Sequence, residues 1–470
     1  MVRWSVLLLL VLFSGSCGGG DAPTTVSASG APPIGADGGS PTDPAAVSKA
    51  IAGRTLVGYQ GWFGCPKEDE LAGAGAAGGL ARSARWRHWF GGQVADAAHL
   101  TVDMLPDVSM LPAAALCRTG LLRPDGSAVV VFSSANAAVL DLHFAWMKAH
   151  GIDGAAVQRF VTELQNPADR DRSNAILQMI RNAAQAHDRV FYVSYDISGA
   201  DPATVYQTIR ADWADLTGTL KITSSRSYLS VQDRPFVQIW GFGFKDRPGE
   251  PAQVLQLLSD LRLDADAGRE PSAASRAPLV IGGVPSGWRT ADGDSKRGDD
   301  WGRVYRSFQV ISPWAVGRYQ DEAGNQRFVD ELIGPDLVET GKLGIAYLPV
   351  IFPGFSWANL MTVRGETAAA IQNRTPRRCG NFLWQQGQSR IAAGARSLFI
   401  AMFDEVDEAT AVMPVVARTA DLPAGTRLIA LDHDGCDLPP DWYLRVSGSL
   451  ADHLRRGQVP PPALSSVLRP

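Results

Sequence analysis

Eight short apolar runs, separated by stretches of helical character, constrain the fold of this 470-residue chain more than any other feature. The runs show little alternation of polar and apolar residues, which is typical of parallel strands that are buried on both faces. A chain of this length can bury a core large enough for one barrel. The runs occupy residues 55–60, 154–159, 190–195, 236–240, 279–284, 308–311, 345–350 and 398–403.

Three of the intervening stretches carry clear helix signals. Residues 139–151 have apolar positions near helical spacing and end at a glycine, residues 173–187 begin with Ser173 as a cap, and residues 251–265 have Pro251 in the first turn. Strand and helix repeated eight times predict a (β/α)8 TIM barrel in the α/β class. The alternative is a doubly wound open sheet, but no glycine-rich phosphate loop follows the first run.

The segment between the first two runs is long, at about 90 residues. It contains strand-like runs at 100–104 and 128–132, which predict a long first βα loop folded as a hairpin over the barrel mouth. After residue 415 the chain turns polar and irregular. We therefore assign residues 48–415 to the barrel and residues 416–470 to a short extension packed on it.

The first 17 residues have the pattern of a lipoprotein-type signal peptide. Arg3 is followed by an apolar segment at 6–13 that is too short to span a bilayer, and small residues then precede Cys17. This pattern predicts lipidation of Cys17 and anchoring in a bacterial membrane; the alternative is a cleaved signal and a soluble secreted product. Residues 18–47 are rich in Gly, Ala, Pro and Ser and are expected to form a disordered linker.

Four further cysteines, none with metal-site spacing, fit an oxidising compartment. They can form two disulfides in three possible pairings, and the sequence does not choose among these. The four are Cys65, Cys117, Cys379 and Cys436.

The overall charge and the tryptophan content narrow the classes of partner. A net charge of −4 gives no basic field, so nucleic acid is not an expected partner. Thirteen tryptophans fit a carbohydrate site, where sugar faces stack on indole, and they also fit plain core packing.

In a TIM barrel the active site lies at the carboxyl ends of the strands, and the residues at those positions are here mainly aromatic and polar. Such a rim favours a sugar site over a phosphate or metal site. The candidate substrate-binding residues are Tyr59, Trp62, His88, Gln158, Arg159, Tyr195, Asp196, Trp240, Trp314, Phe355 and Asp404.

Several of these candidates also have a structural interpretation. His88, which lies close to two tryptophans, is also typical of a histidine satisfied in a core. Arg159 can pair with an acid such as Asp196 or Asp404, and Tyr195 can serve with Asp196 to cap a loop.

The last apolar run ends in four acids within five positions: Asp404, Glu405, Asp407 and Glu408. Glycoside cleavage needs two carboxyl groups, one to protonate the leaving oxygen and one to act as base or nucleophile. Neighbouring acids also raise one pKa, which keeps a proton donor available near neutrality. Glu405 and Glu408 therefore form the candidate catalytic pair. Two alternatives are acids that begin a following helix, stabilised by its dipole, and a metal site made of Asp404, Asp407 and Glu408.

Five motifs in order resemble glycoside hydrolase family 99 and the related 71/99-like bacterial proteins. The resemblance runs from about residue 54 to about residue 415. YQGWF resembles the family's first-strand motif, ARWRHWF its Trp-x-His-Trp motif, and HFAWMKAHGIDGAAVQRF its His-x-x-Trp-Met helix. IFPGF resembles its Pro-Gly-Tyr loop, and EVDEAT its Glu-Trp-His-Glu-Gly-Thr motif. These stretches occupy residues 59–63, 84–90, 143–160, 351–355 and 405–410.

The resemblance implies a retaining, endo-α-mannosidase-like TIM-barrel enzyme. It gives Glu405 the role of assisting the sugar's own 2-hydroxyl to form a 1,2-anhydro intermediate, and Glu408 the role of general acid and then base. Tyr59, His88 and Tyr195 would be sugar contacts. The sequence departs from the family at Val406-Asp407, where the family has Trp-His, and at Ala409, where it has Gly, so the resemblance does not carry the substrate.

Together these observations predict a monomeric glycosidase that acts on a polysaccharide or glycan without a cofactor or a metal. It would be secreted or held at the cell envelope. The alternative is a non-catalytic carbohydrate-binding surface lipoprotein on the same barrel, in which the altered Glu motif marks lost chemistry. A periplasmic scaffold that binds no sugar is a third possibility.

Overall fold

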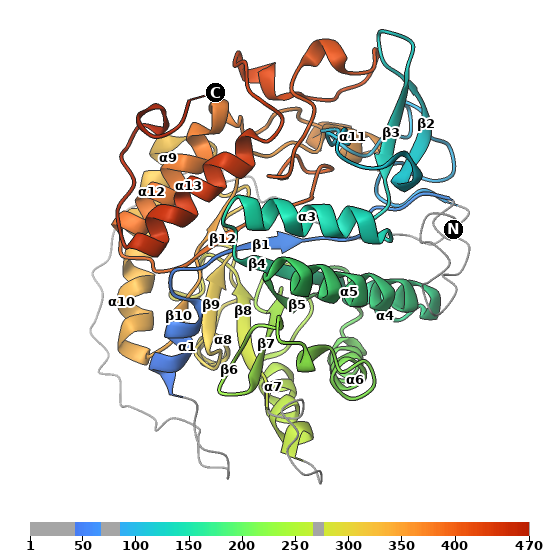
Figure 1. Ribbon diagram of the computed structural model, residues 1–470. Coiled ribbons are helices and arrows are strands. Elements are labelled where there is room, and N and C mark those ends of the chain that lie inside the picture. Colours follow the sequence, from blue (N-terminus) through green and yellow to red (C-terminus); the bar gives the residue numbers. More distant parts are fainter. Residues whose placement is uncertain (1–42, 67–84, 267–276, 470) are drawn as a thin grey trace.

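The computed structural model describes residues 43–66, 85–266 and 277–469 (Figure 1). The predicted signal peptide, Cys17 and most of the predicted linker lie outside these residues. The end of the predicted linker is wrong, because helix α1 (Pro44–Ile51) already begins within it. The Asp43 side chain caps this helix by accepting a hydrogen bond from the Ala45 amide.

The core of the molecule is a closed parallel barrel, which confirms the predicted (β/α)8 fold. Along the sheet the strand order is β10-β9-β8-β7-β5-β4-β1-β12-β11, and each of these neighbours pairs in parallel. The strands are β1 (Thr55–Tyr59), β4 (Gly154–Phe160), β5 (Val190–Asp196), β7 (Arg234–Trp240), β8 (Leu279–Val284), β9 (Val310–Pro313), β10 (Ala346–Tyr347), β11 (Val350–Ile351) and β12 (Leu398–Ile400).

The seventh barrel strand is interrupted rather than continuous, which corrects the prediction of one strand over 345–350. Its first half, β10, pairs with β9, and its second half, β11, pairs with β12. Pro349 lies in the interruption and has no amide proton to donate to a neighbour, although its carbonyl accepts from the Phe399 amide at 3.0 Å. One interrupted strand therefore pairs with β9 through its first half and with β12 through its second half, and in this way it closes the barrel.

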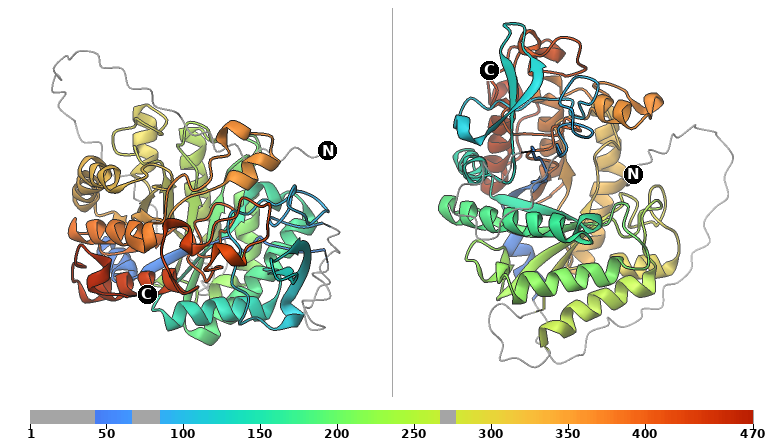
Figure 2. Two further views of the ribbon diagram at one scale, coloured as in Figure 1. Left: turned by 90° about the horizontal axis from the view of Figure 1, so that it is seen from above. Right: turned by 90° about the vertical axis from the view of Figure 1, so that its right-hand side faces the viewer.

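Helices surround the barrel and connect successive strands (Figures 1 and 2). One predicted helix start is wrong. Helix α5 begins at Pro167 and not at Ser173, and its cap is the Asn166 side chain, which accepts from the Ala168 and Asp169 amides. The α-helices after α1 are α3 (Ala137–Ala149), α4 (Val161–Leu164), α5 (Pro167–His187), α6 (Val205–Gly218), α7 (Pro251–Asp266), α8 (Asp299–Tyr305), α9 (Glu322–Phe328), α10 (Gly334–Leu343), α11 (Ala358–Val363), α12 (Asn381–Ala392) and α13 (Trp442–Arg456).

The long first loop contains the expected hairpin, but with a different first strand. Strand β2 (Leu116–Leu122) pairs antiparallel with β3 (Ala128–Phe132), and the Cys65–Cys117 disulfide joins β2 to the segment that follows β1. The predicted partner at 100–104 forms no named strand. Its amides at Asp103 and Met104 instead donate to the Val406 carbonyl, so this segment runs along the loop after β12.

The C-terminal extension packs on the barrel as expected. Its helix α13 lies alongside α12, and the two are drawn next to each other in Figure 1. Trp442, Tyr443 and Leu450 of α13 are buried. A second disulfide, Cys379–Cys436, ties the extension to the segment before α12. The structure thus selects one of the three possible disulfide pairings.

Candidate active site

The four acids after β12 lie in a turn at the carboxyl end of the barrel strands. Asp404 lies in a bend, residues 406–409 form a turn, and no helix begins among residues 404–409, so the helix-dipole interpretation of these acids is wrong. The metal interpretation finds no support either. Within the described residues, no group of three or more His, Cys, Asp or Glu side chains is arranged to hold a metal ion.

Glu405 is buried and receives a hydrogen bond on each carboxyl oxygen. Gln60 Nε2 donates to Oε1 at 2.6 Å, and the Thr410 hydroxyl donates to Oε2 at 2.6 Å. Burial raises the pKa of Glu405 well above its ordinary value, and the nearby Glu408 and Asp407 raise it further. Neither Gln60 nor Thr410 was among the predicted site residues, although both lie inside the motifs that carried the resemblance.

Glu408 is the member of the pair that solvent can reach, because its side chain is only half-buried. Its backbone carbonyl accepts from the Ser356 amide at 2.9 Å, which fixes the turn beneath it. Burial, followed by the negative charges of Asp407 and Asp196, raises the pKa of Glu408 to about 8, against an opposing effect of Arg364. The raised pKa of Glu408 favours its protonated form near neutral pH.

Asp407 and His88 lie next to each other in the candidate site. Asp407 Oδ2 lies 3.6 Å from His88 Nδ1, and buried Asp407 Oδ1 has no hydrogen-bond partner within the part of the chain that the structure describes. Burial lowers the pKa of His88 to about 3, so this histidine is neutral at pH 7 and the contact is not an ion pair. Burial raises the pKa of Asp407 to about 7.

His88 is partly buried, and 30 % of its side chain is exposed. Its ring stacks on the ring of Trp62, with centroids 3.9 Å apart and an angle of 6° between the planes. Trp62 is half-buried and also stacks on Phe160. Both predicted residues therefore lie beside the acids with part of their surface accessible.

Asp404 has a structural role in the barrel rather than a role in ligand binding, which corrects its assignment to substrate binding. It is fully buried, and its two carboxyl oxygens accept the Gln60 and Gly61 amides at 2.7 and 2.9 Å. These bonds fasten the end of β1 to the end of β12. Burial raises the pKa of Asp404 to about 7.

Three further residues that were predicted to bind substrate are also buried and bind other side chains. The Tyr59 hydroxyl donates to His143 Nδ1 at 2.7 Å, and the pKa of His143 is lowered by burial to about 3, which leaves the ring neutral and able to accept. The Tyr195 hydroxyl donates to Asp212 at 2.7 Å, and Arg159 pairs with the same carboxylate. All three predicted residues are at most 1 % exposed. Tyr59, Tyr195 and Arg159 are therefore structural, and the acid that pairs with Arg159 is neither Asp196 nor Asp404.

The remaining predicted residues differ in how much of their surface is exposed to solvent. Asp196 is half-buried and close enough to Glu408 to raise its pKa, while its Oδ1 accepts the Ser198 amide. Trp240 is 6 % exposed and packs edge-to-face on half-buried Trp314, with centroids 5.2 Å apart. Gln158 is half-buried. Phe355 is 2 % exposed and packs on Trp357, so its assignment to substrate binding is wrong.

Comparison with solved structures finds two of a family GH99 endo-α-mannosidase from Bacteroides thetaiotaomicron. The first has a TM-score of 0.56 and 13 % sequence identity, and the match covers 87 % of this chain and 99 % of that one. The second, in complex with bis-tris propane, has a TM-score of 0.56 and 14 % identity over 87 % and 98 % of the two chains. No family model and no curated protein matches the sequence. The chain thus has the fold of these family GH99 structures.

Proposed function

We propose that the chain is a glycoside hydrolase that acts on a polysaccharide or glycan through Glu405 and Glu408. One observation carries the proposal: two neighbouring carboxyl groups with raised pKa values, one held by two donors and the other half-buried, lie at the carboxyl end of a TIM barrel. That is the pair of groups that glycoside cleavage requires. The fold shared with family GH99 endo-α-mannosidase structures supports the proposal.

Glu408 is assigned the role of general acid and then general base. A general acid works best when its pKa lies near the working pH, and the pKa of Glu408 is raised to about 8. Its partial exposure lets a glycosidic oxygen approach. Neighbouring carboxyls repel as anions, so the pair retains a proton near neutrality. We place that proton on Glu408, because Glu405 has a hydrogen-bond donor on each carboxyl oxygen whereas Glu408 is half-buried.

Glu405 is assigned the role of the base that acts on the sugar. The donors Gln60 and Thr410 stabilise its ionised form against the effect of burial. In the proposed step Glu405 takes the proton of the sugar's 2-hydroxyl as that oxygen bonds to C1. The C1 bond to the leaving oxygen breaks, and that oxygen receives the proton of Glu408. Water then attacks C1, gives a proton to Glu408, and the anhydro ring opens as Glu405 returns its proton to the 2-oxygen.

We further propose that the protein works in an oxidising compartment, anchored through Cys17. The two disulfides support such a compartment. Among the described residues no helix combines the length and the apolar character needed to cross a bilayer. A Cys17→Ala variant tests the anchor: release of the variant into the medium is expected, and a variant that stays in the membrane fraction would contradict it.

A product assay tests the function. Full-length protein is incubated with a panel of α-mannans, arabinans, xylans and other glycans, and the released sugars are resolved by chromatography beside Glu408→Gln. We expect product from the wild type and a loss of about 10²- to 10⁴-fold in the variant. Glu339→Gln is the matched control, because Glu339 is a half-buried glutamate that binds Arg306 outside the acid cluster.

The assay also separates the non-catalytic alternative. A carbohydrate-binding protein would bind one glycan of the panel without releasing product, and Glu408→Gln would bind it equally well. A protein that bound no glycan and released no product would overturn both functions.

A further inference from the structure

Arg377 is a buried arginine that joins the active-site loop, defined here as residues 402–413, to the C-terminal extension. The residue is only 5 % exposed. Its Nη1 donates to the Ala409 carbonyl at 3.1 Å, and its Nη2 donates to the Ala411 carbonyl at 2.7 Å. The planar guanidinium therefore fixes two peptide groups at once, as a rigid fork can and a lysine ammonium cannot.

The two peptides that Arg377 holds lie on either side of Thr410, which binds Glu405. The Thr410 hydroxyl donates to Glu405 Oε2, and the Thr410 amide donates to the Glu405 carbonyl at 3.0 Å. The neighbouring Ala409 has a φ of +51°, in the left-handed region that disfavours residues with a side chain. A loop that contains such a residue needs external contacts to keep its shape, and Arg377 supplies two of them.

The extension holds Arg377 from the opposite side. The ring of Tyr443 lies 3.8 Å from the guanidinium carbon, and the Tyr443 hydroxyl donates to the Arg377 carbonyl at 3.3 Å. The next residue, Trp442, donates through Nε1 to the Cys379 carbonyl at 2.9 Å, and Cys379 is linked to Cys436 of the extension. A continuous set of contacts thus runs from helix α13 to the active-site loop.

We propose that Arg377, held by Tyr443 of the C-terminal extension, is a positioning residue that fixes the geometry of the Glu405–Glu408 pair. The role in catalysis rests on the proposed function, whereas the role in ordering the loop does not. The extension then has a task beyond covering the barrel. It holds the loop in the shape that places Thr410 against Glu405 and Glu408 toward the mouth.

The test compares Arg377→Met, Arg377→Lys and Leu450→Ala in the full-length protein. Leu450 is the matched control because it is buried in helix α13, the helix of Tyr443, and lies against Gly387 of α12. The first readout is amide hydrogen exchange across residues 402–413. The second is kcat and KM for the glycan that the wild type cleaves, together with the melting temperature.

We expect Arg377→Met to speed exchange of the loop amides about tenfold or more and to lower kcat by about 10- to 100-fold with little change in KM. The reason is that displacement of reacting groups by about 1 Å costs rates of this order. Arg377→Lys should recover part of the loss, since it restores a donor but not the fork. Leu450→Ala should lower the melting temperature without either effect.

Wild-type exchange and kcat in a folded Arg377→Met protein would overturn the proposal, and so would equal effects from Leu450→Ala. If Arg377→Met does not fold, Tyr443→Leu replaces it, because this change removes the ring and the hydroxyl that hold Arg377. A wild type that releases no product would overturn the proposed function alone, and hydrogen exchange would then decide whether Arg377 orders the loop.

Discussion

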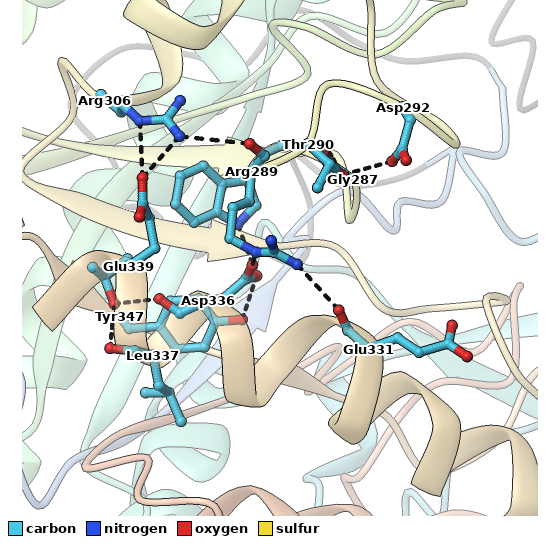
Figure 3. A network of polar contacts seen from close by, with 12 residues as sticks. Gly287, Arg289, Thr290, Asp292, Arg306, Glu331, Asp336, Leu337, Glu339 and Tyr347 are labelled. Carbon is cyan, nitrogen blue, oxygen red and sulfur yellow. Dashed lines mark hydrogen bonds and ion pairs between the residues drawn. The ribbon is translucent and has the colours of Figure 1, made fainter. Parts of the chain in front are cut away.

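Asp336 and the acids that follow β12 are carboxyls with contrasting surroundings. Asp336, at the start of α10, is fully buried and receives three hydrogen bonds (Figure 3). Trp288 Nε1 donates at 2.8 Å, Arg289 Nε at 3.0 Å and the Tyr347 hydroxyl at 3.0 Å. One of its donors is a cation, and burial still raises its pKa to about 6.

The acids that follow β12, at the barrel mouth, instead have one another as near neighbours. Asp407 and Glu408 raise the pKa of Glu405, and Asp407 and Asp196 raise that of Glu408. Among the described residues, one carboxyl oxygen of Asp407 has no hydrogen-bond partner, whereas both oxygens of Asp336 have one. Arg289, which follows β8, binds Asp336, as Figure 3 shows.

The comparison teaches how to separate a structural acid from a functional one when both are buried and both have raised pKa values. A carboxyl that has only donors and a cation as its close partners, as Asp336 has, stabilises the packing around it. Carboxyls that crowd together, with an oxygen left unmatched, oppose folding and are typical of sites where protons move. The following predictions test this distinction, from the largest expected effect to the smallest.

The largest effect is expected at Glu405. Glu405→Gln should lower kcat by about 10²- to 10⁴-fold, because an amide cannot take the proton of a sugar hydroxyl. Its melting temperature should stay near that of the wild type, and initial rates on the cleaved glycan are the measurement. A variant that keeps wild-type turnover would place Glu405 with the structural acids.

Asp336→Ala should act on stability instead. It leaves Arg289, Trp288 and Tyr347 without their common acceptor, and we expect a loss of about 2–4 kcal/mol in the free energy of unfolding, with turnover per folded molecule unchanged. Denaturant unfolding gives the free energy. Glu339→Ala is the control: its pair with Arg306 is about one-third exposed, and its loss should cost no more than about 1 kcal/mol.

The pH dependence of stability should differ between the two groups. A folded-state pKa raised above the unfolded value gives stability that is present below the unfolded pKa and is lost as pH rises through the folded pKa. For Glu408 this window runs from its ordinary 4.5 to about 8, and for Asp336 from 3.8 to about 6.

Melting temperatures measured from pH 4 to pH 9 should therefore fall with rising pH. Glu408→Gln should flatten the curve up to about pH 8, and Asp336→Asn only up to about pH 6. Equal windows for the two variants would remove the proposed difference between the sites.

The smallest effect is expected at Ala409. Its φ of +51° costs an alanine about 1 kcal/mol relative to a glycine, part of which the larger entropy of glycine in the unfolded chain offsets. Ala409→Gly should therefore raise the free energy of unfolding by less than about 1 kcal/mol. A clear loss of stability would show that Arg377 and Thr410 accommodate the alanine without strain.

The barrel could be predicted from the sequence because each strand is buried on both faces and reads as an apolar run. The first strand of the hairpin could not be found in that way. In β2 buried residues alternate with exposed ones, so it has no continuous apolar run. The break in the seventh strand was visible only as Pro349, whose effect depends on which neighbours the strand meets.

The candidate site was predicted in part, because sequence places residues at strand ends but does not tell which way they face. Glu408, His88 and Trp62 keep part of their surface exposed, whereas Tyr59, Tyr195, Arg159 and Asp404 are buried in the packing. The contacts of Arg377 with Ala409 and Ala411 join residues more than 30 positions apart. No local sequence pattern predicts such a contact.

The most direct test of the central claim is how the loss of Glu408 depends on the leaving group. A glycan needs a protonated leaving oxygen, whereas a dinitrophenyl glycoside of the same sugar does not. The first turnover of Glu408→Gln should therefore fall about 10²- to 10⁴-fold below wild type on the glycan and stay close to wild type on the aryl glycoside. Equal losses on both substrates, or no loss on either, would contradict the assignment of Glu408 as the catalytic acid.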